Sequence, residues 1–379
     1  MRQEFDLSAG HAYDLDIPFH AIFLGGLVYM QSWRRSMVVL SAAALCVNVM
    51  LSGAAFAQQE SKADKKASKK EKQEVHELVK LVDEAMTGGT VPSDFSIGWS
   101  DNFMKATENK TYVPFSLTID ASKLMVNPSM AMYLRVVPKT APATATDAKK
   151  EKKKKDDYPF EDVHFFDIQP PAAGQPFDLD RAFAVPAGDY DVYIALQQVA
   201  VKGSKAPQMT SVLKESVSVP DFWNGELTTS SLILTKAIER LQAPLSADDQ
   251  ADHPYVIGNA QIIPSTTSKL AKSGQLSLVF MIYNTGLDAS TKKPDVTVDY
   301  EFYQKTAAGE KFFNKTNPQV FNASTLPPQF NPAAGHQIVA GQTVPLATFP
   351  VGDYRLAITV TDKTSGKTLK RDVLFSVVS

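Results

Sequence analysis

The sequence predicts a mainly β protein with two immunoglobulin-like or fibronectin-like β-sandwich domains in tandem, preceded by a signal peptide and a short amphipathic helix. Three observations predict this class. Apolar and polar residues alternate through most of the chain after residue 91, which is the period of a strand with one buried face. Gly and Pro punctuate these segments at the short spacing typical of sandwiches. The phrase VPAGDYDVYIAL, residues 185–196, also returns as FPVGDYRLAITV, residues 349–360.

Composition sets the broad class. The chain has 379 residues, of which 44% are hydrophobic and 21% are charged, and its formal net charge is -2. This balance is typical of a globular protein with room for two or three domains. Because the chain carries no overall excess of positive charge, we expect no nucleic-acid partner.

Residues 1–57 have the layout of an export signal. The basic pair Arg34-Arg35 precedes an apolar run at residues 37–51, and the small-residue sequence AFA at residues 55–57 offers a cleavage site. The run is shorter than the ~20 residues that a membrane span needs. We therefore expect no membrane span after signal cleavage, and the arginine pair leaves both general secretory and twin-arginine export open.

The signal also sets the expected location and redox state. Met30 and Met37 are alternative translation starts. If translation starts at either of them, the residues before it are not part of the protein. The only cysteine, Cys46, lies inside the apolar run, so an exported mature chain relies on its apolar cores rather than on disulfides. We expect a bacterial exported protein, either periplasmic or extracellular.

Residues 58–91 form a charged spacer that leads into a helix. The spacer QQESKADKKASKKEKQE has little to bury and suits a disordered or a helical segment. Helical spacing then joins six apolar residues: Val75, Leu78, Val79, Val82, Ala85 and Met86. The stripe lacks a large aromatic anchor and its polar face mixes both charges, so we expect it to dock on the following domain rather than on a membrane.

The first β-sandwich is expected at residues 92–243. Alternation is clear in VPFSLTID, AMYLRVV, FEDVHFFDI, FDLDRAFAV and SVLKESVSV. A Lys-rich loop at residues 140–157, TAPATATDAKKEKKKKDD, interrupts these strands and is expected to be disordered. Two interpretations of this loop remain open. It binds an anionic partner, or it is a solvated loop that its own acidic residues partly neutralise.

A domain boundary is expected near residue 243. The stretch KAIER, residues 236–240, suits a short helix, and residues 244–254 form an acidic linker that contains Pro. The second β-sandwich is expected at residues 255–379, where LSLVFMIYN, VTVDYEFYQ and LKRDVLFSVV repeat the alternating plan.

The repeated Pro-x-Gly-Asp-Tyr phrase predicts the same structural corner in both domains. Aligning Tyr190 with Tyr354 matches three apolar positions, so the same strand face is apolar in both copies. Gly188 and Gly352 allow a tight turn with a dihedral that other residues avoid. Each Tyr then resembles the tyrosine corner of Greek-key sandwiches, in which the ring is buried and the hydroxyl bonds to an upstream backbone group.

Phe222 and Trp223 are the candidate contact surface. They follow Pro220 in a turn, where two neighbouring aromatic side chains can be displayed to a partner. The alternative is that Trp223 packs into the junction between the two domains.

Three stretches carry a resemblance to a known family: YVPFSLTID, VPAGDYDVYIAL and VSVPDFWNGELTTSSLILT. They resemble the region that follows the von Willebrand type A-like domain in certain large bacterial exported proteins of unknown function. The resemblance covers mainly residues 99–235. The sequence contains no Asp-x-Ser-x-Ser signature, so the resemblance implies neither the type A domain itself nor its divalent-metal adhesion chemistry.

No motif in the sequence points to catalysis. The histidines after residue 57 are scattered over different segments without metal-ligand spacing: His76, His164, His253 and His336. There is neither a Gly-x-Ser-x-Gly elbow nor a Gly-rich loop that would hold a phosphate. We therefore expect no enzyme, no cofactor and no metal site.

The sequence thus predicts a non-catalytic exported cell-envelope protein with a structural or protein-interaction role through its β-sandwich modules. Its partner is expected to be another envelope protein or polymer. One alternative is a module that binds carbohydrate or another envelope polymer, and a third is a hydrolase with an unrecognised site. Aromatic residues on one exposed loop face would favour carbohydrate, whereas an apolar patch or an open edge strand would favour a protein partner.

Overall fold

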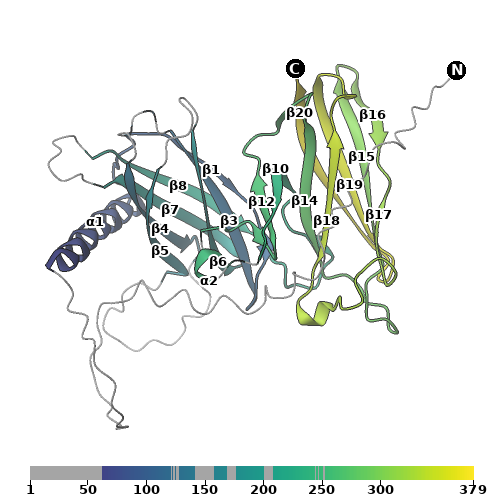
Figure 1. Ribbon diagram of the computed structural model, residues 1–379, viewed down its shortest axis with the longest axis horizontal. Coiled ribbons are helices and arrows are strands. Elements are labelled where there is room, and N and C mark those ends of the chain that lie inside the picture. Colours follow the sequence, from purple (N-terminus) through teal and green to yellow (C-terminus); the bar gives the residue numbers. More distant parts are fainter. Residues whose placement is uncertain are drawn as a thin grey trace, which may run out of the picture.

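The computed structural model describes residues 62–120, 122, 124, 128–140, 158–168, 176–199, 208–243, 245, 247–250 and 252–379, without the side chains of residues 62–70. The export signal expected at residues 1–57 and residues 141–157 of the Lys-rich loop lie outside this part. Two β-sandwiches lie side by side, and helix α1 (Lys62–Met86) packs against the first of them (Figure 1). The expected mainly β class with β-sandwich domains is confirmed.

The first sandwich pairs two antiparallel sheets. One sheet contains β1 (Ile97–Asp101), β2 (Met104–Lys105), β3 (Lys110–Ile119) and β6 (Phe177–Pro186), with β3 at its centre. The facing sheet runs in the order β5 (Phe160–Asp167), β4 (Ser129–Pro138), β7 (Gly188–Gln198) and β8 (Thr210–Val219). The period-two pattern sends alternate side chains between the sheets, so Phe115, Leu117, Val192 and Ile194 are buried in one core.

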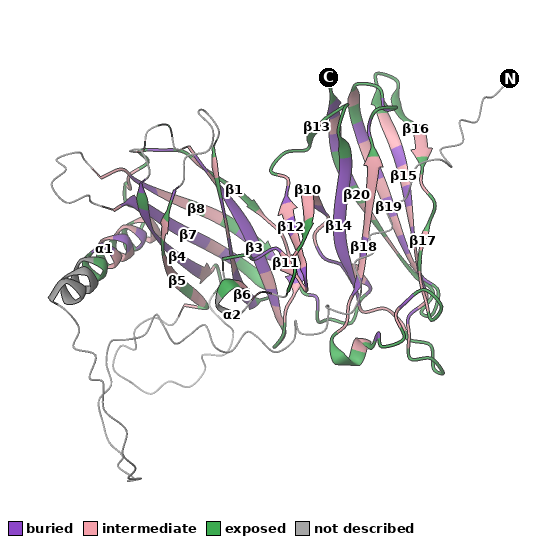
Figure 2. Ribbon diagram, in the orientation of Figure 1, coloured by how far each residue is buried: buried purple, intermediate pink, exposed green. Residues whose placement is uncertain are grey.

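The second sandwich repeats this plan with more strands. Its first sheet contains β9 (Thr228–Thr229), β10 (Ile233–Arg240), β11 (Val256–Ile257), β12 (Ala260–Pro264), β14 (Gln275–Tyr283) and β18 (Ile338–Pro345). The facing sheet contains β13 (Lys269–Ala271), β15 (Val296–Thr306), β16 (Gly309–Lys315), β17 (Gln319–Phe321), β19 (Gly352–Asp362) and β20 (Lys367–Val378). Two short helices accompany these strands, α2 (Ala247–Gln250) and the 3-10 helix η4 (Pro332–Ala334). Figure 2 shows the buried segments along the strands of both sandwiches.

The strand pairing corrects the boundary expected at residue 243. Strands β9 and β10 pair with β14, with Thr229 opposite Ile282 and Ile233 opposite Val279. These strands therefore belong to the second sandwich, and the expected linker at residues 244–254 joins β10 and β11 of one sheet. The helix expected at KAIER is also wrong, because Ile238 pairs with Ile262 of β12 and this tertiary pairing overrides the local helix propensity.

A packed junction joins the two sandwiches. Met104 and Phe222 of the first sandwich form one buried cluster with Tyr255, Met281 and other residues of the second. Hydrogen bonds run across the same contact: the amide of Phe103 donates to Ser231 Oγ at 2.9 Å, and the amide of Ser231 donates to the Phe103 carbonyl at 2.9 Å. Because the junction combines apolar burial with directional bonds, it holds the sandwiches in a defined relation.

Helix α1 covers the outer face of the sheet formed by β4, β7 and β8. Leu78 and Val82 of its apolar stripe are fully buried against Tyr133 and Tyr193 of the sheet. The helix begins at Lys62, so most of the charged spacer is helical. In the part of the chain that the structure describes, no helix is both long enough and apolar enough to cross a membrane.

An arginine on the covered sheet face completes the contact with α1. Arg135 is buried, and its Nη1 lies 2.5 Å from Asp83 Oδ1 of the helix. Its Nε lies 3.1 Å from Glu161 Oε1 on β5, and its guanidinium lies over the ring of Tyr158 with 4.2 Å between the guanidinium carbon and the ring centroid. A buried guanidinium needs such partners, so this cluster places the helix on the sheet in one position.

Candidate functional site

The two Pro-x-Gly-Asp-Tyr phrases form equivalent corners. The hydroxyl of Tyr190 donates to the carbonyl oxygen of Pro186 at 3.0 Å, and the hydroxyl of Tyr354 donates to that of Pro350 at 2.8 Å. Both rings are buried in the core of their own sandwich. The two tyrosines therefore hold the beginnings of β7 and β19, and their rings are not available to a ligand.

Gly188 and Gly352 have φ angles of 153° and 149°. A residue with a Cβ atom adopts such a backbone conformation only with strain. At Gly188, an added Cβ would make an ordinary van der Waals contact with the ring of Tyr190 at 3.5 Å, so the backbone angle and not a clash favours glycine. The glycine thus permits the turn, and the tyrosine two residues later closes it.

Phe222 is not a contact surface, which corrects the expectation from the sequence. Its side chain is only 3% exposed, and its ring centroid lies 5.2 Å from that of Tyr283 in the junction. Trp223 is 42% exposed, but its Nε1 donates to the carbonyl of Lys110 at 3.1 Å. The Nζ of Lys105 lies 4.2 Å from the centre of the Trp223 ring. The first sandwich therefore holds Trp223 at the edge of the junction with a cation against one ring face.

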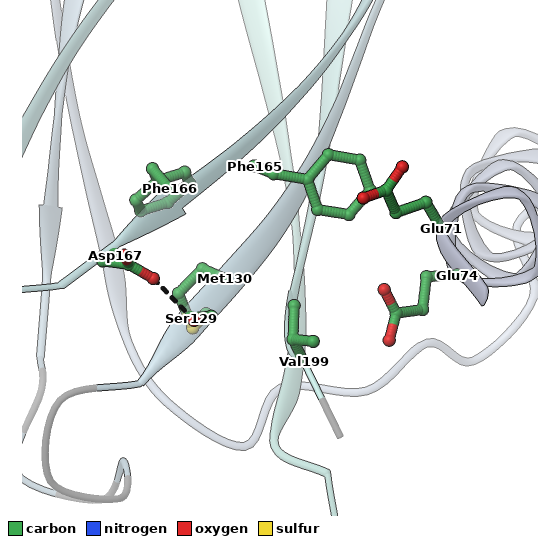
Figure 3. Close-up of a pocket in the computed structure, with 8 residues that line it drawn as sticks. All are labelled: Glu71, Glu74, Ser129, Met130, Phe165, Phe166, Asp167 and Val199. Atoms are coloured by element: carbon green, nitrogen blue, oxygen red, sulfur yellow. Dashed lines mark hydrogen bonds between the residues drawn. The ribbon is translucent and has the colours of Figure 1, made fainter. Parts of the chain in front are cut away.

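The best candidate for a binding site is a groove between α1 and the first sandwich, which we call the α1 groove. It has a volume of about 400 Å³ and lies where β4 begins and where β5 and β7 end (Figure 3). Eight described residues line it: Glu71, Glu74, Ser129, Met130, Phe165, Phe166, Asp167 and Val199.

The lining of the α1 groove combines apolar surface with negative charge. Phe165 is 44% exposed beside Met130, Phe166 and Val199. The charged groups of the lining are carboxylates, two from α1 and Asp167 from β5, and no basic side chain is among the eight. Long cationic side chains can lay an apolar stem against such a surface while their charged end meets the carboxylates. The groove therefore suits a lysine or arginine side chain.

The described lining of the groove contains no Ser-His-Asp arrangement. Ser129 Oγ donates to Asp167 Oδ1 at 2.5 Å, but no histidine is among the described residues that line the groove. On the same strand as Asp167, His164 Nε2 lies 3.1 Å from Asp162 Oδ2 instead. Within the described ranges, no group of three or more His, Cys, Asp or Glu residues is placed to hold a metal ion. The exposed ring of Phe165 and the carboxylates of this lining can take part in recognition of charge and shape.

The α1 groove was not predicted from the sequence. It exists because α1 crosses the outer face of the sheet and brings Glu71 and Glu74 beside the beginning of β4 and the ends of β5 and β7. Sequence alone does not specify that placement. One signal was present: the pair Phe165-Phe166 directs one aromatic side chain to each face of edge strand β5. An apolar side chain on the outer face of an edge strand indicates that something covers or contacts it.

A second polar cluster lies where the two sandwiches meet. Ser116 Oγ donates to Asp180 Oδ1 at 2.5 Å, and Asn102 Nδ2 donates to Tyr255 Oη at 3.0 Å. Burial raises the pKa of Asp180 above its ordinary value, although the Ser116 hydrogen bond opposes this. Burial also raises the pKa of Asp101. The two carboxyls therefore take up protons at a higher pH than exposed aspartates do.

No protein-family model matches this chain, and no curated protein matches it. Among solved structures, the chain is similar to a Salmonella alpha-2-macroglobulin mutant at 9% identity and a TM-score of 0.19, over 76% of this chain and 17% of that one. It is similar to trypsin-activated alpha-2-macroglobulin from Escherichia coli at 10% identity and a TM-score of 0.21, again over 76% and 17%. The chain thus spans less than a fifth of these two structures.

Proposed function

We propose that this chain is a non-catalytic, exported component of the bacterial cell envelope, periplasmic or extracellular, that binds another envelope protein. The observation that carries the proposal is the α1 groove, which places exposed Phe165 beside three carboxylates without a catalytic arrangement. A basic side chain of a partner protein would bury its stem against Phe165 and pair its charge with Glu71 or Asp167.

The rest of the chain supports this proposal. The layout of residues 1–57 supports export, and the resemblance of residues 99–235 to a region of large bacterial exported proteins supports an envelope location. The junction between the sandwiches supports a structural contribution, because it keeps the second sandwich at a defined position relative to the groove.

The alternative partner, an envelope polysaccharide, has less support. Saccharide rings stack on open aromatic faces, but one face of Trp223 is next to the Lys105 ammonium group. The neighbouring rings of half-buried Tyr303 and exposed Phe312 meet at 81°, so they do not form a flat platform.

A pull-down from a bacterial envelope fraction tests the proposal. The bait is the purified chain, compared with a Phe165→Ser, Asp167→Asn double variant and with Leu287→Ser as the matched control for loss of an exposed apolar side chain. We expect the wild type and the control to retain the same discrete protein and the double variant to lose it. Retention only on polysaccharide, or equal retention by the double variant, would overturn the proposal.

A further inference from the structure

The main chain passes from the first sandwich to the second through residues 220–227, which we call the connector. Strand β8 of the first sandwich ends at Val219, and β9 of the second begins at Thr228. The sequence contains a single Asn-Gly pair, Asn224-Gly225, and this pair lies in the middle of the connector. Both of its residues are exposed to solvent.

The connector is held on each side of this pair. Before the pair, Trp223 Nε1 donates to the carbonyl of Lys110 in the first sandwich at 3.1 Å. After the pair, the carbonyl of Glu226 accepts a hydrogen bond from Asn284 Nδ2 of the second sandwich at 2.9 Å. The pair therefore lies between two anchors, one on each sandwich.

The Asn224 side chain is folded back over the main chain that follows it. Its Oδ1 accepts a hydrogen bond from the Glu226 amide at 2.9 Å, which is the geometry of an Asx turn. This places the side-chain carbon Cγ beside the nitrogen of Gly225. Gly225 has a φ of 80°, and a Cβ added to it would meet no atom within 4 Å, so the space around it is open. Within the described residues, the Gly225 amide has no hydrogen-bond partner that would hold it away from Cγ.

We propose that Asn224 is a site of spontaneous self-modification that converts the connector to aspartyl and isoaspartyl forms. The Gly225 nitrogen gives its proton to hydroxide and forms a bond with Asn224 Cγ. The Cγ–Nδ2 bond breaks, and Nδ2 takes a proton from water and leaves as ammonia. Water then opens the cyclic imide. Breaking the new bond at Cγ yields aspartate, and breaking the original peptide bond yields isoaspartate.

The isoaspartyl form changes the connector because its main chain runs through the former side chain and gains one carbon atom. The hydrogen bonds of Trp223 and Glu226 hold the shorter connector at both ends, so we expect the longer one to break at least one of them. The contact between the sandwiches is thereby weakened. The aspartyl form keeps both the length of the main chain and an oxygen that accepts from the Glu226 amide. This inference does not depend on the function proposed for the α1 groove.

Mass spectrometry of the full chain, aged at mildly alkaline pH and then digested, tests the conversion. Asn322 is a matched control within the chain, because its Oδ1 also accepts the amide two residues later, that of Ser324, at 2.9 Å. It differs in being followed by Ala323, whose side chain hinders the attacking nitrogen. We expect a gain of about 1 Da at Asn224. This gain should appear at least about tenfold faster than at Asn322, since glycine carries no side chain. Fragmentation of the peptide distinguishes isoaspartate from aspartate.

Hydrogen exchange tests the effect on the junction. The amides of Phe103 and Ser231 form hydrogen bonds across it, so their exchange reports its opening. In the isoaspartyl fraction of the aged chain we expect both to exchange at least about fivefold faster than in the fresh chain. Aged Asn224→Gln, whose longer side chain closes the ring far more slowly, and freshly purified Asn224→Asp should both exchange like the fresh chain. Conversion of Asn224 no faster than that of Asn322 would overturn the inference. So would an isoaspartyl chain in which Phe103 and Ser231 exchange as before.

Discussion

The Tyr354 hydroxyl donates a hydrogen bond to the carbonyl oxygen of Pro350 at 2.8 Å, and this bond closes the turn that begins β19. The equivalent bond from Tyr190 to Pro186 closes the turn that begins β7. In each case the acceptor lies four residues before the tyrosine, and the intervening glycine has a positive φ. The two phrases that are similar in sequence are thus the same corner in two sandwiches.

Removing a corner hydroxyl should lower stability without changing the surface. Tyr354→Phe leaves the buried ring in place but deprives the Pro350 carbonyl of its donor, so we expect a loss of about 1–2 kcal/mol in the free energy of unfolding. Denaturant unfolding monitored by fluorescence measures this. Tyr303→Phe is the control, because its hydroxyl bonds to the side chain of Glu301 at the surface, and it should cost less than about 0.5 kcal/mol. Equal losses in the two variants would contradict a special role for the corner.

Phe222 and Trp223 are neighbours with different environments, so their truncation should have different consequences. Phe222→Ala removes a buried ring from the junction and should lower the free energy of unfolding by about 3–5 kcal/mol. It should also weaken the contact between the two sandwiches. Trp223→Ala removes a half-exposed side chain and should cost clearly less. Unfolding curves give the energies, and limited proteolysis near residue 227 reports the loosening. The assignment of Phe222 to the junction fails if Trp223→Ala is the more damaging change.

The Asp180 carboxyl should make stability depend on pH. Burial raises its pKa in the folded chain above the unfolded value near 3.8, so protonation favours the folded state. This contribution is fully present below the unfolded pKa and is lost as the pH rises through the folded pKa. We therefore expect the stability of the wild type relative to Asp180→Asn to increase as the pH falls from neutral towards about 4. Urea unfolding of both chains across this range measures the difference, and a difference that does not change with pH would contradict a pKa raised by burial.

Docking of α1 should depend on its buried stripe. Leu78→Ala leaves a cavity between the helix and the sheet and should cost about 2–5 kcal/mol of the docking contact. Lys80→Ala, on the exposed side of the same helix, is the control. Hydrogen exchange of the α1 amides should be faster in the first variant and nearly unchanged in the second. If both variants exchange like the wild type, the stripe does not hold the helix.

The sandwich class could be predicted from the sequence because period-two alternation is a local property. In VPFSLTID, every second residue reaches the core, and Phe115 and Leu117 are fully buried. The corner could be predicted for the same reason, since Gly188, Tyr190 and the Pro186 acceptor lie within five residues of each other.

The boundary and the α1 groove could not be predicted because they depend on contacts between distant parts of the chain. Ile233 pairs with Val279 of β14, and nothing within β10 alone specifies that partner. KAIER has the composition of a helix but pairs as a strand. The groove needs Glu71 of α1 and Asp167 of β5 at one place, which follows from how the helix crosses the sheet.

Photo-crosslinking at position 165 in cells tests most directly whether the α1 groove binds an envelope protein. Phe165 is replaced by a photoreactive phenylalanine derivative, and the same derivative at Leu287 is the control. We predict a discrete, protease-sensitive adduct at position 165 that Asp167→Asn weakens, and none at position 287. A folded, exported chain that gives no protein adduct at position 165, or an adduct with polysaccharide alone, would contradict binding of an envelope protein in the groove.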